Sequence, residues 1–113
     1  MLRPPPSFIL DGKTAKPEPD PAAWDAWMRA ALKDRTRVVA RSRINPKVTV
    51  STVFAGFDQR LDEDSPDHPQ PVFFETAVFK AGKVVRTEYH THWDEAESAH
   101  AAIVAELGGG KPI

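Results

Sequence analysis

The feature of this chain that most constrains its fold is the alternating hydrophobic spacing that begins near residue 36. Between Thr36 and Ile44 apolar and small residues fall on every second position, which is the period of a β-strand. The two faces of this strand are expected to carry Val38, Ala40, Ser42 and Ile44 on one side and Arg37, Val39, Arg41 and Arg43 on the other. Asn45-Pro46 interrupts the pattern, and a β-branched run then continues over residues 48–57. The two strands predict a hairpin with a basic outer face.

A helix is expected before this hairpin. Asp20 can cap free amides at a helix start, and Pro21 loses no hydrogen bond at the first helical position. The helix is predicted to run to about Lys33. Its apolar residues recur at three- and four-residue spacing and so share one face: Trp24, Trp27, Met28, Ala31 and Leu32.

Two more strands and a second helix are expected after it. Residues 58–71 are acidic and proline-rich, which predicts a solvated loop. Strands are expected at 72–79 and 84–90, and a helix begins near Trp93 with Thr91-x-x-Asp94 as its capping box. Gly108-Gly109-Gly110 stops this helix.

The element order is therefore (β)αββββα, in an α+β fold. We expect a four-stranded antiparallel meander with both helices packed on one face, because two amphipathic helices suffice to cover one face of such a sheet. Residues 1–20 are expected to form an extended proline-rich arm, in which 8–10 can pair at a sheet edge, and residues 21–113 a single domain.

Composition excludes several classes of function. The chain has no cysteine, which rules out disulfides, thiolate zinc sites and a cysteine nucleophile. Its 15 Lys and Arg balance 16 Asp and Glu, so the whole molecule has no strong field toward nucleic acid or a membrane. No apolar run is long enough for a bilayer span, and no membrane partner is expected.

The basic strand is the first candidate site. Arg37, Arg41 and Arg43 share a predicted face, and a guanidinium matches a pair of phosphate oxygens. The alternative is that they form the solvated side of a strand, where charge discourages edge aggregation. Nucleic acid is a weaker partner candidate, since no glycine-rich phosphate loop or aromatic platform accompanies the row.

Glu75 is the second candidate, because alternation places it with Phe73 and Phe79. Such a carboxylate is either buried with a partner or exposed beside an apolar patch, where it would anchor a ligand. A structural ion pair is the alternative account.

Histidines give the weakest candidates. His90 and His92 could bind zinc together with Asp94, but their spacing matches no established zinc motif, and surface or capping roles are the alternative. Ser51, His90 and Asp58 can be drawn as a triad, yet no nucleophile elbow surrounds the serine. We therefore expect no catalytic residues, no enzyme activity and no cofactor.

The segments FILDGKTAKPEPD, VSTVFAGFDQR, VFFETAVF and YHTHWDEAESAHAAIV resemble a family of small uncharacterised bacteriophage and prophage proteins. That family has an ILD-type opening, a VSTVFLGLDH-like strand, an LFETMVF-like strand and a TWxEAxxGH-like helix start. The resemblance covers nearly the whole chain. The matching positions are Ser51, Thr52, Phe54, Gly56 and Asp58, then Phe74, Glu75, Thr76 and Phe79, then Trp93, Glu95, Ala96 and His100.

Three positions depart from the family pattern. Ala55 replaces a larger apolar residue, Gln59 stands where the family has His, and His92 stands where it has Thr. If the family's histidine at position 59 served as a ligand or base, its absence would argue against that role here. Asp58, within the same motif, is kept as a candidate partner-binding residue.

The resemblance implies a phage origin and a place in the cytoplasm of the bacterial host. The leading hypothesis is a non-enzymatic binding protein, a counter-defence factor that inhibits a host protein or sequesters a phosphorylated nucleotide ligand. The alternatives are a structural or morphogenesis accessory protein and a small metal-dependent hydrolase. A homodimer is a further hypothesis, because apolar residues such as Val39 and Val53 are expected on the second face of the sheet.

Overall fold

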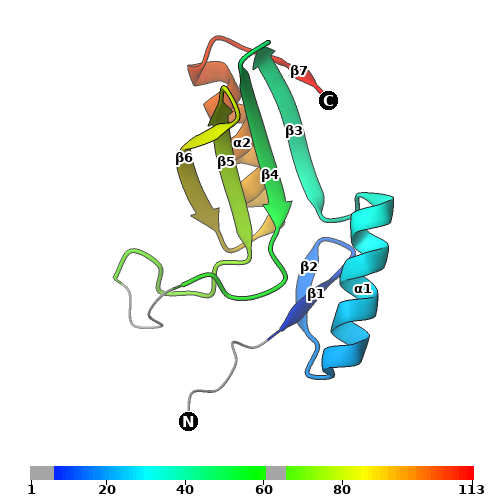
Figure 1. The fold of residues 1–113 in the computed structure, drawn as a ribbon. Helices are drawn as coiled ribbons and strands as arrows, with labels where there is room; N and C mark the ends of the chain where they lie inside the picture. The colour runs from blue at the N-terminus through cyan, green and yellow to red at the C-terminus, as the bar shows by residue number, and fades with distance from the viewer. Residues whose placement is uncertain (1–6, 61–65) are drawn as a thin grey trace.

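The computed structural model describes residues 7–60 and 66–113, which form an α+β fold with two antiparallel sheets and two helices (Figure 1). Residues 1–6 of the expected arm and 61–65 of the expected loop lie outside the described residues. None of the helices in the described part is long and apolar enough to cross a membrane. The elements are β1 (Phe8–Asp11), β2 (Thr14–Pro17), α1 (Pro21–Asp34), β3 (Val38–Asn45), β4 (Val48–Phe54), β5 (Phe74–Lys80), β6 (Lys83–His90), α2 (Trp93–Glu106) and β7 (Lys111–Pro112).

The larger sheet has five antiparallel strands in the order β6-β5-β4-β3-β7. Its first four strands follow the expected meander. The turn between β5 and β6 is formed by Ala81 and Gly82, with φ of 51° and 80°, which suits a two-residue hairpin. The fifth strand, β7, is not predicted by the sequence pattern. The chain passes close to β3 just before β7 begins. A Cβ atom added to Gly110 would lie 2.7 Å from the carbonyl oxygen of Arg43, so a larger residue would clash there.

The N-terminal segment forms its own hairpin rather than an edge strand of the larger sheet. Phe8 pairs with Pro17 across β1 and β2, while a single bridge joins Ser7 to Phe57. The helix α1 packs against β1, and the Trp24 Nε1 donates to the carbonyl oxygens of Phe8 and Gly56, both at 3.1 Å. Figure 1 shows the hairpin and α1 together at one end of the larger sheet. The expectation of two helices on one face is therefore wrong for α1, which packs against β1 of the hairpin and contacts the larger sheet at its end, where the Trp27 ring meets Phe54 edge-on.

Of the two described helices, α2 is the one that crosses a face of β3, β4, β5 and β6. The side chains beneath it form three layers, which follow from the two-residue period of a strand and the 3.6-residue period of a helix. A buried aromatic layer contains Phe54, Phe74 and Ala96, and an aliphatic layer contains Val50, Val78 and Ile103. Between them lies a buried polar layer of Ser42, Thr52, Thr76 and His100.

Both helix starts are capped by side chains, but one differs from the prediction. The Asp20 carboxylate accepts from the Ala22 N–H at 3.1 Å, which confirms the cap of α1. For α2 the N-cap is His92, whose backbone N–H donates to Glu95 at 3.0 Å. The predicted Thr91–Asp94 capping pair is therefore wrong by one residue: Thr91 lies before the N-cap, and the residues of the capping box are His92 and Glu95.

A bulge in β3 decides which of its side chains share a face. Val38 pairs with Val53, whereas Ala40 pairs with Thr52, so Val39 is an extra residue. Because Thr52 lies beneath α2, Ala40 faces α2 and Val38 faces the other side. The predicted alternation therefore fails at the start of this strand and holds from Ala40 onward.

Candidate anion-binding face

We call the face of the larger sheet opposite α2 the open face, because neither helix packs across it in the described part of the chain. Directly paired residues of neighbouring strands project to the same side of a sheet. The strand register therefore places three rows on the open face: Lys111, Arg43, Thr49, Phe79 and Val84; Arg41, Ser51, Ala77 and Thr87; and Val53, Glu75 and Tyr89.

The open face and α2 differ in charge. The open face and its adjoining β3–β4 turn carry four exposed cations: Arg41, Arg43, Lys47 and Lys111. Glu75 is the one carboxylate within the three rows. By contrast, α2 contains the acidic residues Asp94, Glu95, Glu97 and Glu106 and no lysine or arginine. The net charge of −1 is therefore the sum of a positively charged open face, which we also call the basic face, and a negatively charged α2.

A hollow of about 350 Å³ lies on the basic face where the β3–β4 and β5–β6 turns meet. Arg41, Lys47 and Phe79 are among its lining residues. The two turns are fixed to each other, because the Ala81 N–H donates to the carbonyl oxygen of Lys47 at 2.9 Å. The Asn45 side chain holds the first turn by accepting from the Lys47 N–H at the same distance. Two cations and an aromatic ring are therefore held around one concave surface.

A second hollow, of about 650 Å³, adjoins the first, and Pro46 lines both hollows. Arg43 and Lys111 line it together with the glycine run 108–110. These two cations are direct partners across β3 and β7. All four cations of the basic face thus line one of two adjoining hollows.

Arg37 does not belong to this row, contrary to the sequence prediction. Its backbone carbonyl accepts from the Phe54 N–H, and its Nε donates to the Phe54 carbonyl at 3.0 Å. Burial lowers the pKa of Arg37. The bulge at Val39 reverses the side on which residues before it project, so Arg37 is separated from Arg41 and Arg43.

The predicted patch of Phe73, Glu75 and Phe79 is also divided. Phe73 is buried in the core, with its ring centroid 4.5 Å from that of Phe8. Glu75 lies on the open face but accepts from the Gln59 side-chain amide at 3.0 Å, so among residues 7–60 and 66–113 its partner is a hydrogen-bond donor and not a cation. Only Phe79 joins the basic hollow. The N-terminal hairpin, which the sequence pattern does not predict, is what covers Phe73.

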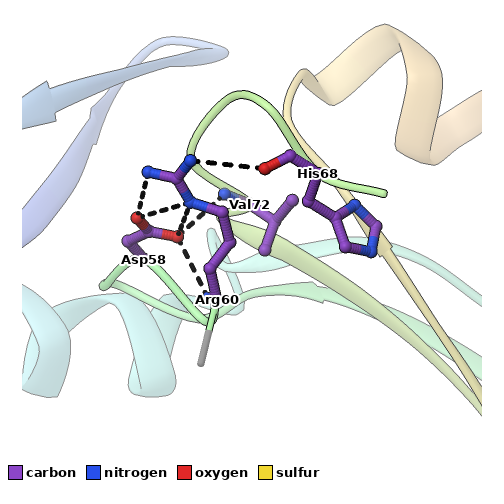
Figure 2. A network of polar contacts seen from close by, with 4 residues as sticks. All are labelled: Asp58, Arg60, His68 and Val72. Carbon is purple, nitrogen blue, oxygen red and sulfur yellow. Dashed lines mark hydrogen bonds and ion pairs between the residues drawn. The ribbon is translucent and has the colours of Figure 1, made fainter. Parts of the chain in front are cut away.

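Asp58 has a structural role at the base of the loop that follows β4 (Figure 2). Its carboxylate forms an ion pair with Arg60 at 2.9 Å and accepts from the Val72 N–H at 3.1 Å. Arg60 also donates to the carbonyl oxygen of His68 at 3.3 Å. Burial acts to raise the pKa of Asp58, but the hydrogen bonds from Arg60 and Val72 and the charge of Arg60 lower it, and the net shift is downward. Asp58 is thus committed to contacts within the chain.

The histidines occupy separate environments. The Nε2 of His90 lies 3.3 Å from the Thr76 hydroxyl, whereas His92 is exposed at the start of α2. Within residues 7–60 and 66–113 no group of three or more His, Cys, Asp and Glu could hold a metal ion. Ser51 lies on the open face, on the side opposite Thr76, and Asp58 is paired with Arg60, so the triad drawn from the sequence does not assemble.

The sequence prediction placed neither Lys47 nor Lys111 among the candidate site residues, and it missed one buried network. Lys47 and Lys111 join the basic face only through a turn and through β7, and no periodic pattern marks either position. His100 lies in the polar layer, where its two ring nitrogens are 2.9 Å from the Ser42 hydroxyl and 2.8 Å from the Thr52 hydroxyl. The sequence feature that indicates burial of His100 is its position among the apolar residues on one face of α2.

The basic face has the chemistry of an anion-binding surface. Guanidinium and ammonium groups bind phosphate oxygens, and an aromatic ring offers a surface on which a base can stack. Comparison of the chain with family models, with curated proteins and with solved structures finds no match.

Proposed function

We propose that this chain is a non-enzymatic binding protein that holds a nucleotide against its open face. The observation that carries the proposal is the hollow in which Arg41 and Lys47 lie beside Phe79. The two cations would bind phosphate oxygens, and the aromatic ring would contact the base.

Three features of the face support a phosphorylated ligand. Neither cation of this hollow takes part in the ion pairs found among the described residues. No acidic residue occurs in β3, β4 or the turn between them. The hollow of about 350 Å³ is within the usual range for small-ligand sites.

The biological setting of the proposal comes from the resemblance to phage proteins. A phage protein that sequesters a nucleotide would withdraw a signal from a host defence system. An acidic surface of a host protein would suit the same cations, but such a partner predicts no thermal shift with any nucleotide.

A thermal-shift screen tests the proposal. The probes are nucleoside mono- and triphosphates, cyclic dinucleotides and inorganic phosphate. We expect at least one nucleotide to raise the melting temperature more than phosphate does at equal concentration, because only the nucleotide can also contact Phe79. Arg41→Ala and Lys47→Ala should each reduce the shift.

The matched control is Arg29→Ala. Arg29 is an exposed arginine on α1 that pairs with Asp25, so this variant removes the same charge far from the open face. It should leave the shift unchanged. If no nucleotide raises the melting temperature, or if Arg29→Ala reduces the shift as much as Arg41→Ala does, the proposal is wrong. Binding of an acidic host protein without any nucleotide binding would also overturn it.

A further inference from the structure

We infer that the outer edge of β6 is an interaction surface for a second copy of this chain. The inference does not depend on nucleotide binding.

The strand β6 is eight residues long and forms one end of the larger sheet. It pairs with β5 on one side, so its other side presents unpaired N–H and C=O groups in the described part of the chain. Its residues include Val84, Val85 and Tyr89, whose exposed fractions are 54%, 59% and 39%. The opposite edge differs, because β7 has two residues and one is Pro112.

The order of side chains on β6 makes the strand complementary to itself. In an antiparallel pair of two β6 strands related by a two-fold axis through Thr87, residues equally distant from Thr87 lie opposite each other. Arg86 then lies opposite Glu88 of the second copy, and Glu88 opposite Arg86 of the second copy. Thr87 meets Thr87. Val85 is the extra residue at the irregularity where β6 pairs with β5, so it lies outside this regular register.

Each of these contacts belongs to a favourable class of cross-strand pair. Opposite charges and two threonines both stabilise antiparallel strands. The charged pairs are already positioned within one chain. The Arg86 Nε donates to Glu88 at 2.9 Å, and Arg86 also forms an ion pair with Glu106 of α2. Pairing of two copies would therefore continue an existing charge network across the axis.

This register also determines on which side of the dimer's sheet each α2 and each open face lies. A residue-centred two-fold pairing keeps α2 of both copies on one side of the continuous sheet and both open faces on the other. The acidic helices would share one side and the four cations of each copy the other. The dimer expected from apolar surface on the open face is thus replaced by one that leaves the open face free.

Sedimentation equilibrium of the full chain tests the inference. We expect a species of twice the 12.5 kDa chain mass at micromolar to millimolar concentration. Arg86→Glu places glutamates opposite glutamates, and Glu88→Arg places arginines opposite arginines. Each variant alone should be monomeric where the wild type is dimeric, with a Kd raised at least about tenfold. Arg29→Glu on α1 is the matched control and should remain dimeric.

Mixing the two single variants gives the sharper result. In the proposed register both glutamates of the Arg86→Glu strand face both arginines of the Glu88→Arg strand. An equimolar mixture should therefore form a heterodimer although neither variant forms a homodimer. Circular dichroism verifies that each variant is folded. A monomeric wild type over the whole range, or folded variants that fail to form a heterodimer in the mixture, would overturn the inference.

Discussion

The Nδ1 of His100 lies 2.8 Å from the hydroxyl of Thr52, which joins α2 to the middle strand of the sheet inside the core. Thr52 in turn lies 2.7 Å from the Thr76 hydroxyl on β5. Thr52, Thr76 and His100 are 0%, 1% and 4% exposed. A fully hydrogen-bonded polar layer of this kind fixes the position of α2 along the sheet, because a shifted helix would leave buried polar groups unpaired.

Replacing His100 should therefore be costly. His100→Leu leaves the hydroxyls of Ser42 and Thr52 without their imidazole partner, and we expect a loss of about 2–3 kcal/mol in the free energy of unfolding. Urea denaturation measures the loss. His92→Leu alters an exposed histidine at the start of the same helix and should change stability by no more than about 0.5 kcal/mol.

A double-mutant cycle with Thr52→Val checks the origin of that loss. The combined loss in His100→Leu/Thr52→Val should be smaller than the sum of the two single losses. The reason is that Thr52→Val removes the hydroxyl that His100→Leu leaves without its imidazole partner. Additive losses would show that the hydrogen bond contributes little.

Stability should fall on mild acidification. Burial lowers the pKa of His90 and of His100 below the ordinary value of 6.5. The unfolded chain therefore binds protons more readily than the folded chain, so the stabilisation is present above the unfolded pKa and is lost as pH falls through 6.5. The midpoint of urea unfolding should decrease between about pH 7 and pH 5. His100→Gln should reduce this dependence, and an unchanged midpoint in the wild type would contradict it.

Asp58→Asn should destabilise the base of the loop. The Asp58 and Arg60 side chains are 14% and 8% exposed, so the change removes a charged partner from a largely buried guanidinium. We expect a loss of about 2–3 kcal/mol. The control is Asp25→Asn, which breaks the exposed ion pair with Arg29 and should cost less than about 1 kcal/mol. Equal losses in the two variants would show that burial of the pair has little effect.

Protonation of the Asp58 carboxylate should lower the free energy of unfolding in a separate, more acidic pH range. Because the pKa of Asp58 is below its ordinary value of 3.8, its stabilisation is present above that value and is lost as pH falls through the lower folded pKa. Asp58→Asn should remove this part of the acid transition and leave the histidine effect near pH 6.5 intact. A wild type and an Asp58→Asn variant with the same acid transition would contradict this assignment.

The sequence allowed the meander and both helices to be predicted, because their hydrophobic periods are regular over seven or more residues. The bulge at Val39 could not be predicted, since it depends on pairing with β4, and it removed Arg37 from the candidate face. The burial of Phe73 likewise depends on long-range packing against Phe8.

The candidate site was predictable only in part for the same reason. Arg41, Arg43 and Phe79 follow from alternation within single strands. Lys47 and Lys111 join them because the β3–β4 turn and β7 bring distant segments together. Local spacing predicts which side chains share a strand face, whereas the shape of a hollow is decided by how strands and turns meet.

The central claim, that the open face binds a nucleotide, is tested most directly by titration calorimetry with the nucleotide that gives the largest thermal shift. The titration compares the wild type with Arg41→Glu and with the control Arg29→Glu. We predict saturable binding that weakens at least about tenfold in Arg41→Glu, because a charge-assisted contact becomes repulsive, and that is unchanged in Arg29→Glu. Equal affinity of the wild type and Arg41→Glu would contradict the claim.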